Sequence, residues 1–275
     1  MPGVEAFPVI DVLPAPEAAD AHAPKSEESR GRAEPPRATL ALWPGPARSA
    51  EIVVHRGAAR RDVHCIGLPA VLDDRFVMLR EPESARARSY RLLRHRLLAL
   101  ADPRIVAVTS ARSGEGKTSC GLNLAFALAE DAMVRVLLLE ANLRRPILGR
   151  LFGFDPEESI VENIVRYVEV GPPYPVTSIA GTRVDVAALP TAPLPDARLD
   201  RTLFAGVLCD LRTAYDYIVI DAGSVLESAD ADVVGECSSG VVLTARAGRS
   251  RATDLRRAAS QLSPASVLGT VLLDS

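Results

Sequence analysis

Short apolar runs alternate with segments of helical periodicity along the chain from residue 104 onward. The apolar runs are rich in valine, isoleucine and leucine and predict buried strands at 104–109, 134–139, 184–189, 217–221, 240–245 and 266–272. The segments between them predict helices at 117–131, 145–152, 200–213, 228–236 and 250–262. This alternation is typical of an α/β protein in which helices cover both faces of a mostly parallel sheet. We therefore expect a three-layer α/β sandwich, with ligands bound beyond the carboxyl ends of its strands.

The first 83 residues follow a different pattern. Residues 1–50 hold nine of the 21 prolines and show no apolar periodicity, which predicts a disordered, Pro/Ala-rich tail. Residues 51–83 contain short apolar pieces at 52–54 and 76–79. These pieces predict short strands, or an extended arm or linker that packs on the domain. The folded domain is expected to span residues 84–275.

Residues 84–100 predict a helix, because Tyr90, Leu93, Leu97 and Leu100 recur at helical spacing. A row of basic residues follows a neighbouring face of this helix, at Arg88, Arg91 and Arg94. Three interpretations are open for this row: a solvated face, a contact between subunits, or a surface for an anionic partner.

Residues 153–183 lack the strand–helix alternation. A short helical piece is predicted from Ile160 to Val168. The stretch 171–175 reads Gly-Pro-Pro-Tyr-Pro, and its three prolines argue against the interior of a regular element. We expect this stretch to form a surface loop.

Residues 104–118 combine a strand, a glycine-bearing loop and the start of a helix, which is the setting of a phosphate-binding P-loop. Ala111 stands where the pattern has its first glycine, and we interpret the motif as intact because alanine tolerates most of that turn. Backbone N–H groups of such a loop point at phosphate oxygens. Lys117 is expected to bridge the terminal phosphates, and the Thr118 hydroxyl to bind Mg²⁺. The candidate nucleotide-binding residues are Ser113, Gly114, Glu115, Gly116, Lys117, Thr118 and Ser119.

Two apolar strands end in an acidic residue that is suited to hold the metal ion. Ile218-Val219-Ile220-Asp221 follows the Walker B pattern, and Asp221 is predicted to bind Mg²⁺ directly or through water. Leu137-Leu138-Leu139-Glu140 is the second case, and Glu140 is a candidate for a metal ligand or a catalytic base. The candidate catalytic residues are thus Lys117, Glu140 and Asp221, and the candidate metal ligands are Thr118, Asp221 and Glu140.

The bulk properties exclude several classes of protein. No stretch approaches the ~20 apolar residues that span a bilayer, and the N-terminus lacks the pattern of a signal peptide. The four cysteines show no CxxC pair and no metal-ligand spacing. These features favour a reduced, cytoplasmic protein. The formal net charge of −3 gives no indication of a nucleic-acid partner.

The motifs together resemble those of the bacterial tyrosine kinases (BY-kinases), which belong to the MinD/ParA-type P-loop ATPases. The resemblance runs from about Phe76 to the C-terminus. It rests on Thr109-Ser110 with Gly114–Thr118, on Leu137–Pro146, on Leu151-Phe152-Gly153, on Tyr215–Asp221 and on Val241–Gly269. It implies ATP and Mg²⁺ as cofactors and autophosphorylation on tyrosine, in exopolysaccharide or capsule synthesis and chain-length control. It also implies an inner-membrane polysaccharide co-polymerase as activator, peripheral association with that membrane through the partner, and a possible homo-oligomer.

The chain departs from the family pattern at three points. Where the family has Asp-x-Asp-x-Arg, this chain has Glu140-Ala141-Asn142-Leu143-Arg144, and an amide at 142 cannot take a proton. Arg88 replaces the glutamate of the family's subunit-contact segment. The five tyrosines form no cluster like the family's tyrosine-rich tail.

Three functional hypotheses follow from these matches and departures. The first is a protein-tyrosine autokinase and ATPase. The second is a degenerate kinase that binds nucleotide and regulates a co-polymerase without phosphorylating anything. The third is a MinD/ParA-like positioning ATPase, which is disfavoured because Arg112 stands where such proteins carry an additional lysine.

Overall fold

The computed structural model describes residues 12–13, 60–100, 104–166, 171–192, 197–262, 265 and 267–273. These residues belong to one compact unit. Most of the predicted tail (1–50) and the apolar piece at 52–54 lie outside the described residues. The described part of the tail, Val12–Leu13, forms the short strand β1.

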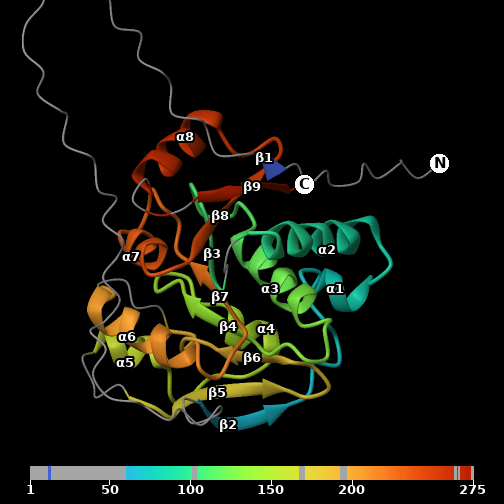
Figure 1. The fold of residues 1–275 in the computed structure, drawn as a ribbon, viewed down its shortest axis with the longest axis vertical. Coiled ribbons are helices and arrows are strands. Elements are labelled where there is room, and N and C mark those ends of the chain that lie inside the picture. The colour runs from blue at the N-terminus through green and yellow to red at the C-terminus, as the bar shows by residue number, and fades with distance from the viewer. Residues whose placement is uncertain are drawn as a thin grey trace, which may run out of the picture. The chain divides into compact units, whose positions relative to one another are not determined.

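A mixed, mostly parallel sheet forms the centre of the unit (Figure 1). Its strand order is β1-β9-β8-β3-β7-β4-β6-β5-β2. The central strands are β3 (Ile105–Ser110), β7 (Tyr217–Ala222) and β4 (Val136–Ala141), flanked by β8 (Gly240–Arg246), β9 (Val267–Leu273) and β6 (Val184–Ala187). These six are mutually parallel, whereas β1 and β5 (Tyr174–Ile179) run antiparallel to their neighbours β9 and β6. At the far edge, β2 (Arg60–Ile66) pairs in parallel with β5.

Helices cover both faces of the sheet, as expected for a three-layer α/β sandwich (Figure 1). One face packs against α1 (Val77–Arg80), α2 (Ala85–Leu98), α3 (Lys117–Leu128) and α4 (Leu148–Phe152). The other packs against α5 (Ile160–Val165), α6 (Arg201–Leu211), α7 (Asp230–Glu236) and α8 (Ala252–Gln261). Because strand side chains alternate in direction, Leu138 enters the first layer while Leu137 and Leu139 enter the second.

All six predicted strands and all predicted helices are present, with ends that differ by a few residues. The prediction of a surface loop at 171–175 is wrong for Tyr174 and Pro175, because these two residues begin the strand β5. At Pro175 the strand is paired with β2, and its pairing with β6 starts only at Thr177. Proline has no N–H to donate to a neighbouring strand. Pro175 is tolerated because β5 has a paired strand on only one side at this residue.

The described residues before residue 84, which are 60–83, pack on the domain. The prediction of a strand at 76–79 is wrong, because Val77–Arg80 forms the helix α1. Phe76 precedes this helix and is fully buried. Its ring lies 5.2 Å from that of Phe152 and 6.2 Å from that of Phe126, measured between ring centroids. Residues outside the predicted 84–275 domain thus contribute to its core.

Two members of the basic row on α2 form ion pairs within the chain. Arg91 and Arg94 both contact Glu130, just beyond the end of α3, at 2.6 and 3.0 Å. The Arg88 guanidinium donates to the carbonyl of Glu83. These pairs connect α2 to α3, although exposed ion pairs of this kind add at most ~1 kcal/mol each.

The aromatic contacts of Phe76 lead to a stability prediction. We expect Phe76→Ala to lower the free energy of unfolding by about 3 kcal/mol or more, because it leaves a cavity between Phe126 and Phe152. Val71→Ala serves as the control, since Val71 is 87% exposed and its truncation should stay within ~0.5 kcal/mol. Urea unfolding followed by circular dichroism measures both. Equal, small effects would show that the segment before α2 is not part of the core.

Candidate functional site

The loop between β3 and α3 has the backbone of a phosphate-binding loop. Gly114 and Gly116 adopt left-handed conformations, with φ of 83° and 86°, and α3 begins at Lys117. A Cβ atom at Gly116 would lie 2.2 Å from the side chain of Leu273, and one at Gly114 would lie 2.7 Å from the Arg249 guanidinium. The left-handed backbone favours glycine at both positions, whereas the nearby Leu273 and Arg249 atoms are ends of flexible side chains that can shift. Ala111 is fully buried at the start of the loop.

A buried carboxylate connects this loop to the segment between β8 and α8. The carboxylate of Glu115 accepts hydrogen bonds from the Arg112 N–H at 2.8 Å and from the Ser250 hydroxyl at 2.5 Å. The Ser250 hydroxyl accepts in turn from the Arg246 N–H. The Arg112 guanidinium forms an ion pair with Asp254 at 2.7 Å. The side chain of the predicted ligand residue Glu115 thus supports the loop.

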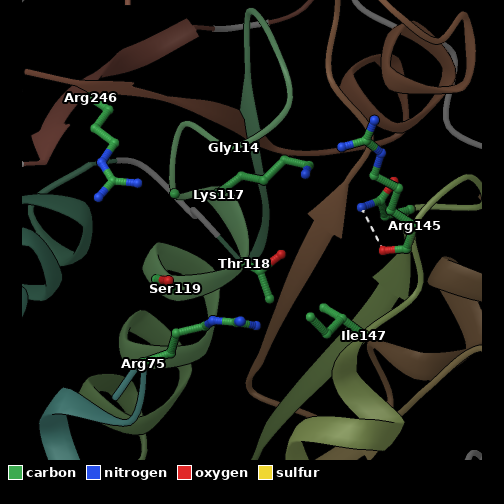
Figure 2. Close-up of a pocket in the computed structure, with 10 residues that line it drawn as sticks. Arg75, Gly114, Lys117, Thr118, Ser119, Arg145, Ile147 and Arg246 are labelled. Atoms are coloured by element: carbon green, nitrogen blue, oxygen red, sulfur yellow. Dashed lines mark hydrogen bonds between the residues drawn. The ribbon is translucent and has the colours of Figure 1, made fainter. Parts of the chain in front are cut away.

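A cavity of about 310 Å³ lies over the loop and the start of α3 (Figure 2). Of the seven predicted nucleotide-binding residues, Gly114, Gly116, Lys117, Thr118 and Ser119 line it. Ser113 and Glu115 are not among its lining residues. The lining is completed by residues that the motif did not indicate, namely Arg75, Asn142, Arg145, Ile147 and Arg246. Four cationic side chains and no carboxylate are therefore found in the lining, which suits a polyanionic ligand.

The predicted metal ligands Thr118 and Asp221 are in contact. The Thr118 hydroxyl donates to Oδ2 of Asp221 at 2.7 Å. Asp221 is fully buried, and its Oδ1 has no hydrogen-bond partner among the described residues. Burial raises the pKa of this carboxyl, while the charge of Lys117 and the Thr118 hydrogen bond oppose the rise. A buried carboxylate oxygen without a partner, beside a threonine hydroxyl, is the donor set that fits Mg²⁺ or its bound water.

Glu140 lies beside Asp221 on the neighbouring strand, but its carboxylate has other partners. Its Oε1 accepts from the N–H groups of Ile147 and Leu148 at 2.5 and 2.9 Å, and its Oε2 accepts from Leu189 at 2.9 Å. Glu140 is fully buried and does not line the cavity. The three hydrogen bonds connect Glu140 to the start of α4 and to the segment after β6. Its predicted roles as base and metal ligand stay predictions, and these three bonds occupy most of the acceptor sites of the carboxylate.

Asn142 and Arg145 form the wall of the cavity opposite α3. The Asn142 side chain donates to the Arg145 carbonyl at 3.0 Å, and the Arg145 guanidinium donates to the Ser113 hydroxyl at 2.8 Å. The first of these contacts is the dashed line in Figure 2, where Lys117 extends toward Arg145. The turn after β4 therefore reaches back to the phosphate loop.

Three cationic lining residues were missed by the sequence analysis. Arg246 ends β8 and Arg145 follows β4, so the rule that ligands bind beyond the carboxyl ends of strands was a usable signal for both. Arg75 precedes α1, far from any motif, and nothing in the local sequence indicated it. No cluster of three or more metal-binding His, Cys, Asp or Glu side chains occurs among the described residues.

Comparisons with known proteins agree with this geometry. The tyrosine-protein kinase YwqD of Bacillus subtilis is 26% identical over 202 residues, which cover 71% of this chain and 84% of that protein. The kinase domain of VpsO superposes with a TM-score of 0.59 at 25% identity, covering 69% of this chain and 96% of that one. The chain is a homologue of the bacterial tyrosine kinases. Its relatives also include the succinoglycan biosynthesis transport protein ExoP of Rhizobium meliloti, 26% identical over 63% of this chain and 22% of that protein. No protein-family model matches the chain.

The burial of Glu140 leads to a prediction on pH. Burial raises the pKa of Glu140 from 4.5 to about 7, against the opposing effect of its three N–H bonds. Between these pH values the folded chain keeps a proton that the unfolded chain has released, so stability falls as the pH rises. Without Mg²⁺ and nucleotide, we expect the wild type to lose about 2–3 kcal/mol more than Glu140→Gln between pH 5 and pH 8.

Urea unfolding of both proteins at the two pH values measures this difference. Asp221 is present in both proteins, so its own titration contributes to both curves. Identical pH dependence in the two proteins would contradict the assignment of the effect to Glu140.

Proposed function

We propose that this BY-kinase homologue binds MgATP in the cavity over its phosphate loop and acts as a protein-tyrosine autokinase. The observation that carries the proposal is the contact between Thr118 and the buried Asp221, beside Lys117. This contact, next to a cavity lined by cationic side chains, supports Mg²⁺ binding by the two residues. The identity of the homologues as tyrosine-protein kinases supports the same reaction class.

The charges of the cavity support a nucleotide whose phosphates lie along the loop. The N–H groups at the start of α3 and the Lys117 side chain, which lines the cavity, would contact phosphate oxygens. Bound Mg²⁺ would neutralise charge on the β- and γ-phosphates. In this arrangement Thr118 and Asp221 hold the ion, Lys117 holds the terminal phosphates, and Arg145 lies on the opposite wall.

The proposed setting is the synthesis and chain-length control of exopolysaccharide or capsule. The relative ExoP, a succinoglycan biosynthesis transport protein, supports this setting. Among the described residues no helix is long and apolar enough to cross a bilayer. We propose that an inner-membrane co-polymerase activates the chain and holds it at the cytoplasmic face of that membrane. The domain limits proposed from the sequence, 84–275, need to be extended to include β2 and α1.

A second candidate function is a nucleotide-binding regulator that transfers no phosphate. Three of the described tyrosines, Tyr90, Tyr174 and Tyr215, are buried, and Tyr167 lies outside the described residues. Tyr217 is partly exposed. The bonded state of Glu140 and the amide of Asn142 likewise favour binding without transfer. No observation on this structure favours the third hypothesis, a positioning ATPase.

Lys117 offers the direct test of nucleotide binding. We expect Lys117→Met to weaken MgATP binding by about 10- to 100-fold, because a charge-assisted contact to the phosphates is lost. Arg112→Met is a matched control, since it removes a cation from the same loop that is paired with Asp254 outside the cavity. Isothermal titration calorimetry measures both. Equal affinities for the two variants would overturn the proposed site.

Asn142→Asp separates the autokinase from the regulator. If the missing carboxylate limits transfer, we expect this change to raise phosphate incorporation into an added tyrosine peptide by about tenfold or more. The variant also loses the hydrogen bond to the Arg145 carbonyl, at a cost of about 1 kcal/mol. Asn163→Asp, on α5 and outside the cavity, makes the same charge change as a control. Radiolabelled ATP gives the readout, and no incorporation in any variant would favour the regulator.

A further inference from the structure

Arg75 enters the cavity from a segment that precedes every recognised motif. It lies two residues before α1 and is part of the cavity lining. Figure 2 shows its guanidinium extending toward Thr118 and Ile147, on the side of the cavity away from Arg246. The phosphate loop and Arg75 therefore face the same volume from two different parts of the chain.

The backbone of Arg75 is fixed to the helix that begins at the phosphate loop. The fully buried Asn123 of α3 donates to the Arg75 carbonyl at 2.6 Å and to the Ser119 carbonyl at 2.7 Å. Its side-chain oxygen accepts from the N–H of Met78 at 2.9 Å. The next residue, Phe76, is anchored between Phe126 and Phe152. Arg75 is thus held in a defined position relative to Thr118.

The side chain of Arg75 retains donors for a ligand. Its Nε lies 3.4 Å from Asp73, and among the described residues its terminal nitrogens have no hydrogen-bond acceptor. Its positive charge acts on the buried Asp221. Since Asp221 and Thr118 mark the metal end of the site, where the β- and γ-phosphates lie, the guanidinium is oriented toward that end of the nucleotide.

We propose that Arg75 contacts the γ-phosphate of bound ATP, in the manner of an arginine finger supplied within the same chain. This inference rests on the proposed function and adds a residue to it. An arginine contributes a planar set of donors that matches phosphate oxygens. Such a residue stabilises the charge on the phosphoryl group during transfer. ADP lacks that phosphate, so the role predicts discrimination between the two nucleotides.

The test compares Arg75→Ala with Arg80→Ala. Arg80 is a matched control, because its side chain is also 37% exposed, it also pairs with a neighbouring aspartate (Asp74), and it does not line the cavity. For Arg75→Ala we expect the affinity for a non-hydrolysable ATP analogue with Mg²⁺ to fall about tenfold or more. The affinity for MgADP should stay within about twofold, as should both affinities of Arg80→Ala. Where the wild type turns over ATP, turnover of Arg75→Ala should fall about 100-fold.

Equal losses for ADP and for the ATP analogue, or no loss for either, would overturn the role of Arg75. Thermal unfolding of each variant checks that it is folded, and Arg75→Gln replaces Arg75→Ala if the latter is not. The affinity comparison decides the role even if the chain transfers no phosphate. A wild-type chain that binds neither nucleotide would instead overturn the proposed function, so the two failures are distinguishable.

Discussion

A single buried carboxylate, that of Asp221, constrains the whole site. The parallel pairing of β3 with β7 sets Asp221 opposite Val108, at the carboxyl end of the sheet and beneath the start of α3. An ionised carboxylate without solvent is costly unless other groups compensate it. Here Thr118 supplies a hydrogen bond, Lys117 and Arg75 supply positive charge, and one oxygen is left without a described partner. A cation or a water molecule beside that oxygen would complete the set of partners of Asp221.

The phosphate loop depends on contacts with residues that lie before it and after it in the chain. On one side, Glu115 bonds to Ser250 and the side chain of Leu273 fills the space beside Gly116. On the other side, Asn123 links α3 to the segment that carries Arg75. The loop itself contributes backbone geometry, while distant residues determine its position and the charge around it. Substitutions in these supporting contacts should therefore affect nucleotide binding even though they lie outside the motif.

The features that the sequence predicted well are local. The central strands, and the strand–loop–helix setting of Gly114, Gly116, Lys117 and Thr118, follow from periodicity and a short motif. The features that it missed are set by tertiary contacts. Arg75 enters the site because Asn123 and two phenylalanines hold its segment. The carboxylate of Glu140 is bonded by N–H groups from residues up to 49 positions away. Pro175 is tolerated in β5 because the pairing of β5 with β6 starts only at Thr177.

In the proposed function, nucleotide binding and phosphoryl transfer rest on different residues. Phosphoryl transfer proceeds through a loose transition state, so positioning and charge stabilisation supply most of the catalysis. The residues for that task, Lys117, Thr118 and Asp221, match the motif pattern. The departures from the family pattern, Asn142 and the bonded Glu140, concern instead the removal of a proton from the acceptor. In the proposed function, these departures therefore concern the acceptor side of the reaction, whereas the residues on the ATP side match the motif. A chain of this kind can keep nucleotide-dependent conformational changes after losing tyrosine phosphorylation, and the two properties have to be measured separately.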